Sequence, residues 1–168
     1  MAKGLELKGI QVRPAPEKAG VEPQVDVAIT VANSTQSTTY QLMAEPLDIH
    51  YEASTRTLFL SLSEPEQNPL EGWDVHGRPL AFVTLEYGET KVLHVSIPTL
   101  IKKIIPNGME TKLECTDISA IEHIACTIAH SERAFYPVSS ETTNQMHDRL
   151  RAWGKKVSKT LDITLSKN

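Results

Sequence analysis

The chain has 168 residues, 17 Lys and Arg against 21 Asp and Glu, a formal net charge of −4 and 40% hydrophobic residues. This length is typical of one domain, here residues 1–168, that buries enough surface to fold without a disulfide or a metal. The negative charge and the absence of a basic stripe argue against nucleic-acid binding. Because no apolar run is long enough for a signal peptide or a membrane span, we expect a cytoplasmic protein, with export by a route that needs no signal peptide left open.

Apolar and polar residues alternate along much of the chain, a period that predicts half-buried β-strands. The first such segment, 5–12, changes phase at Lys8-Gly9, and a glycine at a phase change indicates a β-bulge. A connection with three prolines follows over 13–24. Further strands are predicted at 25–31, 47–51, 58–62, 92–97 and 161–165.

Turn residues and helical spacing supply the remaining elements. Tyr87-Gly88-Glu89 separates two strand-like stretches, 80–86 and 90–98, and predicts a hairpin. Between Pro98 and Pro106, a run of apolar residues at helical spacing predicts one or two helical turns; these are Leu100, Ile101, Ile104 and Ile105.

A second helix is predicted over 141–153. Ser139 or Ser140 is a candidate N-cap and Gly154 suits the C-terminal stop. The apolar stripe of this helix consists of Met146, Leu150 and Trp153. About eight hairpin-rich strands with one late helix predict an all-β fold, a two-sheet antiparallel β-sandwich of immunoglobulin-like or jelly-roll type, with one α-helix before the last strand.

Candidates for chemistry are few. His123, Cys126 and His130 lie within eight residues, but alternation along a strand places His123 on the face opposite the other two. We therefore predict no metal and no cofactor, with Cys126 as a small buried apolar residue. A disulfide between Cys115 and Cys126 across a hairpin stays open, although a reducing cytoplasm disfavours it. No nucleophile motif, P-loop or dinucleotide fingerprint occurs, which argues against an enzyme.

A connection of unusual length, residues 63–79, is the first candidate site. It holds Trp73, Asp74, His76 and Arg78 among three prolines, and structureless loops of this length are usually functional or disordered. Two interpretations stay open. Trp73 either caps one end of the core, or it lies at the surface with His76 and Arg78 as a contact residue, since Trp and Arg are enriched at binding hot spots.

A second loop, 131–140, contributes Phe135 and Tyr136. If one end of the sandwich gathers both loops, they form an aromatic patch rimmed by Glu132, Arg133 and Arg78, suited to protein binding. The expected function is a non-enzymatic module that binds another protein through end loops, or itself through an edge strand. The first and last strands are the edge candidates, the last one protected by lysines: Lys155, Lys156, Lys159 and Lys167.

Two other functions remain as alternatives. A sandwich can bind a small apolar or sugar ligand, with Trp73 stacking on it and Asp74 accepting its hydrogen bonds. A metal-dependent enzyme would need His123, Cys126 and His130 to converge, which the predicted strand does not allow.

Overall fold

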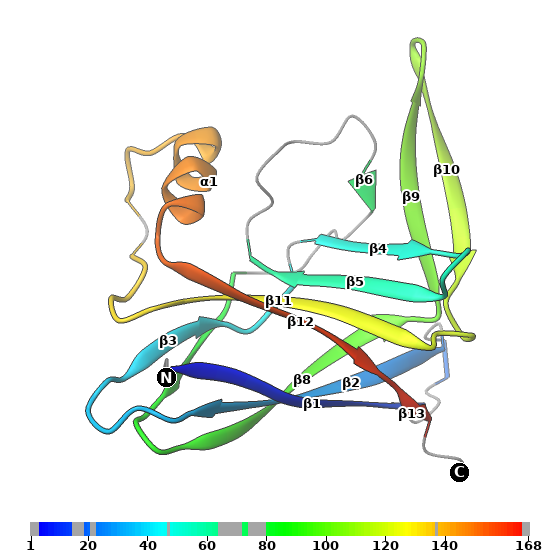
Figure 1. Ribbon diagram of the computed structural model, residues 1–168. Helices are drawn as coiled ribbons and strands as arrows, with labels where there is room; N and C mark the ends of the chain where they lie inside the picture. The colour runs from blue at the N-terminus through cyan, green and yellow to red at the C-terminus, as the bar shows by residue number, and fades with distance from the viewer. Residues whose placement is uncertain are drawn as a thin grey trace.

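The computed structural model describes residues 4–14, 19–20, 23–46, 48–63, 72–73, 80–136 and 138–165. The described chain is all-β apart from one short helix, and its two larger sheets face each other as in a sandwich (Figure 1). The predicted all-β, sandwich-like fold with one late helix is confirmed, whereas the third, three-stranded sheet and the two parallel pairings were not predicted. No helix within these described ranges is long and apolar enough to cross a membrane.

One sheet has four strands in the order β13-β1-β2-β8. They span Leu5–Pro14 (β1), Gln24–Asn33 (β2), Thr90–Pro98 (β8) and Thr164–Leu165 (β13). The register of β1 against β2 shifts between Leu7 and Gly9, which confirms the bulge predicted at Lys8-Gly9. The bulge restores an inward direction to Ile10 and Val12, both buried, so both halves of β1 face the core.

The second sheet has the order β4-β5-β11-β3-β7, with β12 also paired to β11. Its strands span Tyr40–Met43 (β3), Asp48–Glu52 (β4), Thr57–Leu62 (β5), Phe82–Leu85 (β7), His123–Ser131 (β11) and Lys155–Asp162 (β12). Most pairings are antiparallel, but β11 runs parallel to β5, and β13 runs parallel to β1. After β12 the chain passes from this sheet to the other one, which closes the sandwich along one side.

The core lies between the two sheets and follows the predicted alternation. Val27, Ile29 and Val31 of β2 have no exposed surface, and neither do Leu58, Leu60 and Leu62 of β5. Phe59 points away from this core, and its ring stacks on His50 across β4 and β5 at 4.4 Å. Burial of these aliphatic side chains is the main driving force for the fold.

A long hairpin stands out from the sandwich (Figure 1). It consists of β9 (Leu100–Asn107) and β10 (Glu110–Asp117), with β6 (Gly72–Trp73) paired to β9. The helical turns predicted at 100–105 are therefore wrong. Helical and strand periods cannot be separated over so short an apolar run, and the β-branched isoleucines favour the extended chain that β10 pairs with. Gly108, with φ of 64°, makes the tight turn.

The strands on either side of Tyr87-Gly88-Glu89 do not form the predicted hairpin, because β7 pairs with β3 and β8 pairs with β2 in the opposite sheet. Asn33 holds this connection in place. Its buried amide donates to the carbonyls of Thr38 and Leu85 at 2.7 and 3.2 Å. Its backbone N–H donates to the carbonyl of Glu89 at 2.9 Å. Asn33 is thus the buried last residue of β2, 1% exposed.

Of the two predicted edge strands, the last one is an edge, because β13 ends the four-stranded sheet, whereas the first one is not. β1 lies between β13 and β2, so it is not an edge strand, whereas β8 ends the four-stranded sheet. On β12, Lys155, Lys156 and Lys159 are exposed, and Lys159 donates to the carbonyl of Leu7 in β1 at 3.4 Å. Lys159 therefore lies along the seam where β12 passes β1, and Lys167 lies outside the described residues.

The helix α1 spans Thr143–Arg151 and is shorter than the predicted 141–153. Thr142 is its N-cap in place of Ser139 or Ser140, in a capping box with Gln145. Leu150 is 2% exposed and Trp153, just after the helix, is 9% exposed. The predicted apolar stripe thus fixes α1 against one end of the sandwich.

Candidate functional site

The end of the sandwich beside α1 combines an aromatic cluster, exposed apolar side chains and a hollow in the surface. We call it the α1 end, comprising residues 131–136, 138–141, α1 and residues 152–155. Its foundation is an aromatic cluster in which the Trp153 ring lies 5.3 Å from Phe82 and 6.4 Å from Phe135. The Trp153 indole N–H also donates to the carbonyl of Arg133 at 2.8 Å. Trp153 therefore ties the segment before α1 to β7.

Arg149 of α1 fixes the same segment from the other side. Its guanidinium makes two hydrogen bonds to the carboxylate of Glu141, at 2.7 and 2.8 Å, and one to the carbonyl of Tyr136 at 2.7 Å. It also lies over the Phe135 ring, 4.1 Å from its centroid. Arg149 lowers the pKa of Glu141 through these hydrogen bonds. The bidentate geometry holds the backbone around Tyr136 in one position.

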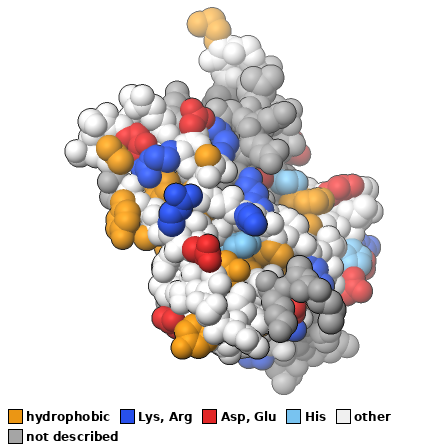
Figure 2. Space-filling model, turned by 60° about the vertical axis from the view of Figure 1, so that its left-hand side comes forward, with side chains coloured by type: hydrophobic (Ala, Val, Ile, Leu, Met, Phe, Trp, Pro, Cys, Tyr) orange, Lys and Arg blue, Asp and Glu red, His pale blue; other side chains and the backbone are white. Residues whose placement is uncertain are grey.

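Apolar side chains are exposed on this fixed segment. Tyr136 is 72% exposed and Val138 is 50% exposed, while the neighbouring Phe135 packs inward on Phe82 at 5.8 Å. Figure 2, which brings the α1 side forward, shows hydrophobic side chains next to a gathering of Lys and Arg on this face. The segment is anchored by its inner side chain and presents its outer ones to solvent.

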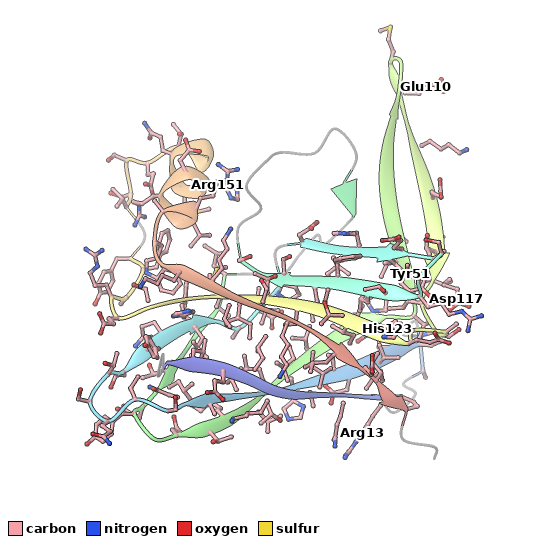
Figure 3. The ribbon with its side chains drawn as sticks, in the orientation of Figure 1. Arg13, Tyr51, Glu110, Asp117, His123 and Arg151 are labelled. Atoms are coloured by element: carbon pink, nitrogen blue, oxygen red, sulfur yellow. The ribbon has the colours of Figure 1, made fainter. Side chains whose placement is uncertain are left out.

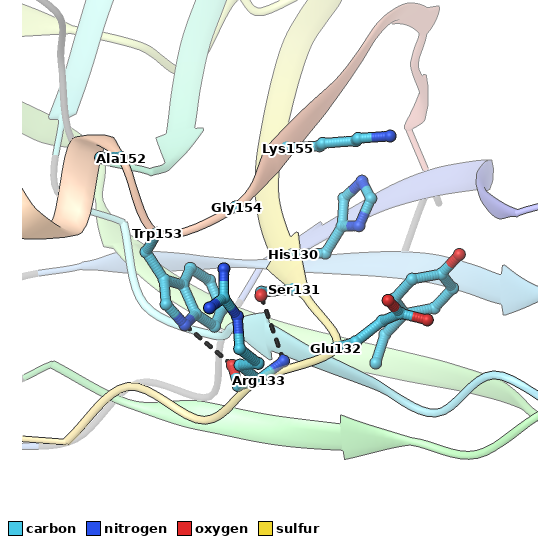
Figure 4. A pocket seen from close by; sticks show the side chains of 9 residues that line it. His130, Ser131, Glu132, Arg133, Ala152, Trp153, Gly154 and Lys155 are labelled. Atoms are coloured by element: carbon cyan, nitrogen blue, oxygen red, sulfur yellow. Dashed lines mark hydrogen bonds between the residues drawn. The ribbon is translucent and has the colours of Figure 1, made fainter.

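An open hollow of about 700 Å³ lies next to this segment. Figure 4 shows it between the start of β12 and the end of β11. Aromatic rings and charged groups line it together: Tyr40, His130, Glu132, Arg133, Trp153 and Lys155. The size falls in the range of ligand-binding clefts.

His130 lies on the wall of this hollow, paired in register with Lys155. Its ring meets the Tyr40 ring edge-on at 5.1 Å. Burial lowers the pKa of His130, and the positive charge of Lys155 adds to this effect. The imidazole is thus held toward its neutral form, while the nearby cations supply the positive charge of the hollow.

The residues predicted as contacts are placed as follows. Phe135 and Tyr136 both lie at the α1 end, the first half-buried and the second exposed. The backbone of Trp73 lies in β6 opposite Lys103 of β9, away from the α1 end (Figure 1). Asp74, His76 and Arg78 lie outside the described residues.

The three candidate metal ligands do not converge. His123 begins β11 and its ring contacts Asp162 at 2.7 Å, whereas His130 lies seven residues along the strand, roughly 23 Å away. Figure 3 shows His123 near Tyr51 and Asp117, on the side of the molecule opposite Arg151 of α1. Among the described side chains, no group of three His, Cys, Asp or Glu is arranged to hold a metal ion.

The two cysteines are free and lie in different sheets. Cys115 of β10 is exposed, and Cys126 of β11 is buried with Ile124 and Ile128. Burial raises the pKa of Cys126 to about 12, so its thiol remains protonated and apolar in character. The prediction that Cys126 is a buried apolar residue is confirmed.

Comparisons of the chain with models of protein families, with characterised proteins and with solved structures find no match. The protein is an all-β, sandwich-like protein in which α1 and the segment before it cover one end of the sandwich. Sequence reasoning missed Arg149 and Lys155 as parts of that end, and Tyr40 of β3 as part of the lining of the hollow. An arginine in the last turn of a predicted helix was the available signal for Arg149, whereas nothing local marks Lys155 or Tyr40.

Proposed function

We propose that this protein is a non-enzymatic module that binds another protein through the α1 end, with Tyr136 and Val138 as its central contacts. The single observation that supports this most is the exposed Tyr136 on a backbone fixed by Arg149. An exposed aromatic residue normally loses conformational freedom on binding, and a prior restraint lowers that cost. Tyrosine and arginine are also the residue types enriched at interface hot spots.

The surroundings of Tyr136 match the usual anatomy of an interface. Its apolar neighbour Val138 lies two residues along the chain, and the ion-paired Arg149 and Glu141 lie beside this segment. An apolar centre with a polar rim is how protein-binding patches are built. The predicted contacts Phe135 and Tyr136 enter this proposal as the anchor and the exposed contact respectively.

The test is selection of binders from a phage-displayed library of random twelve-residue peptides on the intact chain, followed by affinity measurement with labelled peptides. Replacing Tyr136 by Ser should weaken the selected peptides by about tenfold or more, as for an interface hot spot. Tyr87→Ser is the matched control, because Tyr87 is 57% exposed but lies in the β7–β8 connection. Failure to enrich any peptide, or equal binding to the Tyr136 variant, would contradict the proposal.

A small-ligand module is the second candidate, favoured by the hollow of about 700 Å³ and its two aromatic rings. A monosaccharide or small aromatic compound that quenches tryptophan fluorescence, and loses this effect in Tyr40→Ala, would support it. Self-assembly through the open edge of β8 is the third, and concentration-dependent sedimentation of the wild-type chain would support that one.

A further inference from the structure

We propose that the hollow at the α1 end recognises an acidic peptide segment of the partner, with Arg133 and Lys155 as the cations that bind its Glu or Asp carboxylates. This inference rests on the proposed function and names the chemistry of the partner. Its basis is that two cations, Arg133 and Lys155, line the hollow although the chain as a whole has a formal net charge of −4.

Arg133 and Lys155 are the cations that line the hollow, and both are exposed. Neither side chain forms an ion pair with a residue in the described part of the chain, unlike Arg149 and Arg151, which pair with Glu141 and Asp148. Unpaired cations at the rim of a cleft attract carboxylates, and a guanidinium can bind one through two parallel hydrogen bonds.

Glu132 is the one acid on the lining. Its carboxylate forms no ion pair with Arg133 or Lys155 among the described contacts, and Figure 4 shows it apart from the Arg133 guanidinium. The two cations therefore remain available to an incoming anion. His130, whose ring is held toward the neutral form between Tyr40 and Lys155, adds a hydrogen-bonding group without a fixed charge.

The apolar contacts lie on the same segment. Arg133 is three residues before Tyr136, and the carbonyl of Arg133 is fixed by the Trp153 indole at 2.8 Å. A peptide that places a carboxylate at Arg133 and Lys155 can thus place an apolar residue against Tyr136 and Val138. The expected partner segment combines acidic residues with at least one aliphatic or aromatic residue.

The peptide selection described above gives the first readout. Peptides selected on the wild-type chain should be enriched in Asp and Glu relative to the unselected library. The double variant Arg133→Ser with Lys155→Ser should weaken them by about tenfold or more, because a charge-assisted contact is lost at each of the two cations. Circular dichroism of this variant should match that of the wild type, since both side chains are exposed.

The matched control is Lys102→Ser with Lys112→Ser on the β9–β10 hairpin. Both of these lysines are exposed, so the control lowers the net charge equally but away from the hollow. Equal weakening by both double variants would overturn the inference, as would selected peptides with no excess of acidic residues. If such peptides still depend on Tyr136, the proposed function stands without the acidic partner.

Two further outcomes complete the test. Failure to enrich any peptide, or binding that ignores both Tyr136 and the two cations, would overturn the inference and the proposed function together. An oligothymidine of twelve nucleotides that binds the wild-type chain more tightly than the selected peptides would overturn the assignment to a protein partner. Weaker oligothymidine binding agrees with the inference.

Discussion

The carbonyl oxygen of His130 lies only 2.1 Å from the position that a β-carbon would occupy on Gly154. β12 can begin here and pair with the end of β11 because residue 154 has no side chain. Gly154→Ala is expected to destabilise the fold by about 1–3 kcal/mol, since the added methyl group meets backbone rather than a flexible side chain. Thermal unfolding followed by circular dichroism measures this effect.

Gly9→Ala is the control for this prediction, because nothing lies within 4 Å of a β-carbon there. The control should stay close to the stability of the wild type. Equal stability of the two variants would show that the start of β12 does not approach the end of β11 this closely.

Asn33 is expected to be essential to the connection between the sheets. Asn33→Asp keeps the acceptor used by Thr35 at 3.0 Å, but it loses the donors to the Thr38 and Leu85 carbonyls. The variant should lose about 2–4 kcal/mol in urea unfolding, because buried carbonyls are left unsatisfied beside a carboxylate. Ser34→Ala, which removes exposed hydrogen bonds to Gly4, should cost less than about 1 kcal/mol. An Asn33→Asp variant as stable as the wild type would refute this role.

Arg149 is expected to keep the α1 end in one conformation. Arg149→Lys retains the charge but cannot reproduce the simultaneous contacts with Glu141, Tyr136 and Phe135. Amide hydrogen exchange over residues 132–141 should therefore become faster. Arg56→Lys, at the exposed ion pair with Glu122, should leave this segment unchanged. Unchanged exchange in Arg149→Lys would mean that other contacts fix the segment.

Protonation of His130 should make the stability depend on pH. Burial, aided by Lys155, lowers its pKa in the folded protein below the ordinary value of 6.5. The unfolded chain therefore binds a proton at a higher pH than the folded one, and stability falls as the pH drops from about 6.5 toward the folded-state pKa. His130→Asn should reduce the difference in Tm between about pH 7.5 and 5.5. An identical difference in wild type and variant would contradict this assignment.

The pKa of His130 is lowered by burial and by the charge of Lys155, and removing the charge alone provides a further control. Lys155→Gln leaves the His130 ring buried, so it should reduce the same Tm difference less than His130→Asn does. The two variants are compared by their change with pH, because each substitution also alters the stability at a single pH.

The two thiols are expected to react differently with a thiol reagent. Cys115 is exposed, whereas burial raises the pKa of Cys126 to about 12. A native chain should therefore react rapidly at one thiol and an unfolded chain at two, because the thiolate is the reactive species. Cys115→Ser should abolish the rapid native reaction, and Cys126→Ser should leave it intact. Rapid native modification of Cys126 would show that β11 opens locally.

Much of the candidate site could not have been predicted from the sequence. Leu150 and Trp153 followed from helical periodicity, and Tyr136 from its place in a polar connection. The hollow depends on pairing between β11 and β12, which brings His130 beside Lys155 although they lie 25 residues apart. The contact between Arg149 and the Tyr136 carbonyl likewise requires the chain to turn back before α1.

The sequence by itself determined which residues face inward on β2, β5 and β8, the bulge at Gly9, and a helix near the C-terminus. These features are local, because each depends on the period of apolar residues or on one turn residue. Only the tertiary structure decided that residues 100–107 form a strand, that β7 and β8 belong to opposite sheets, and that β1 is an inner strand. Strand pairing is a choice among distant partners, made by the shared burial of two sheets, and no local pattern records it.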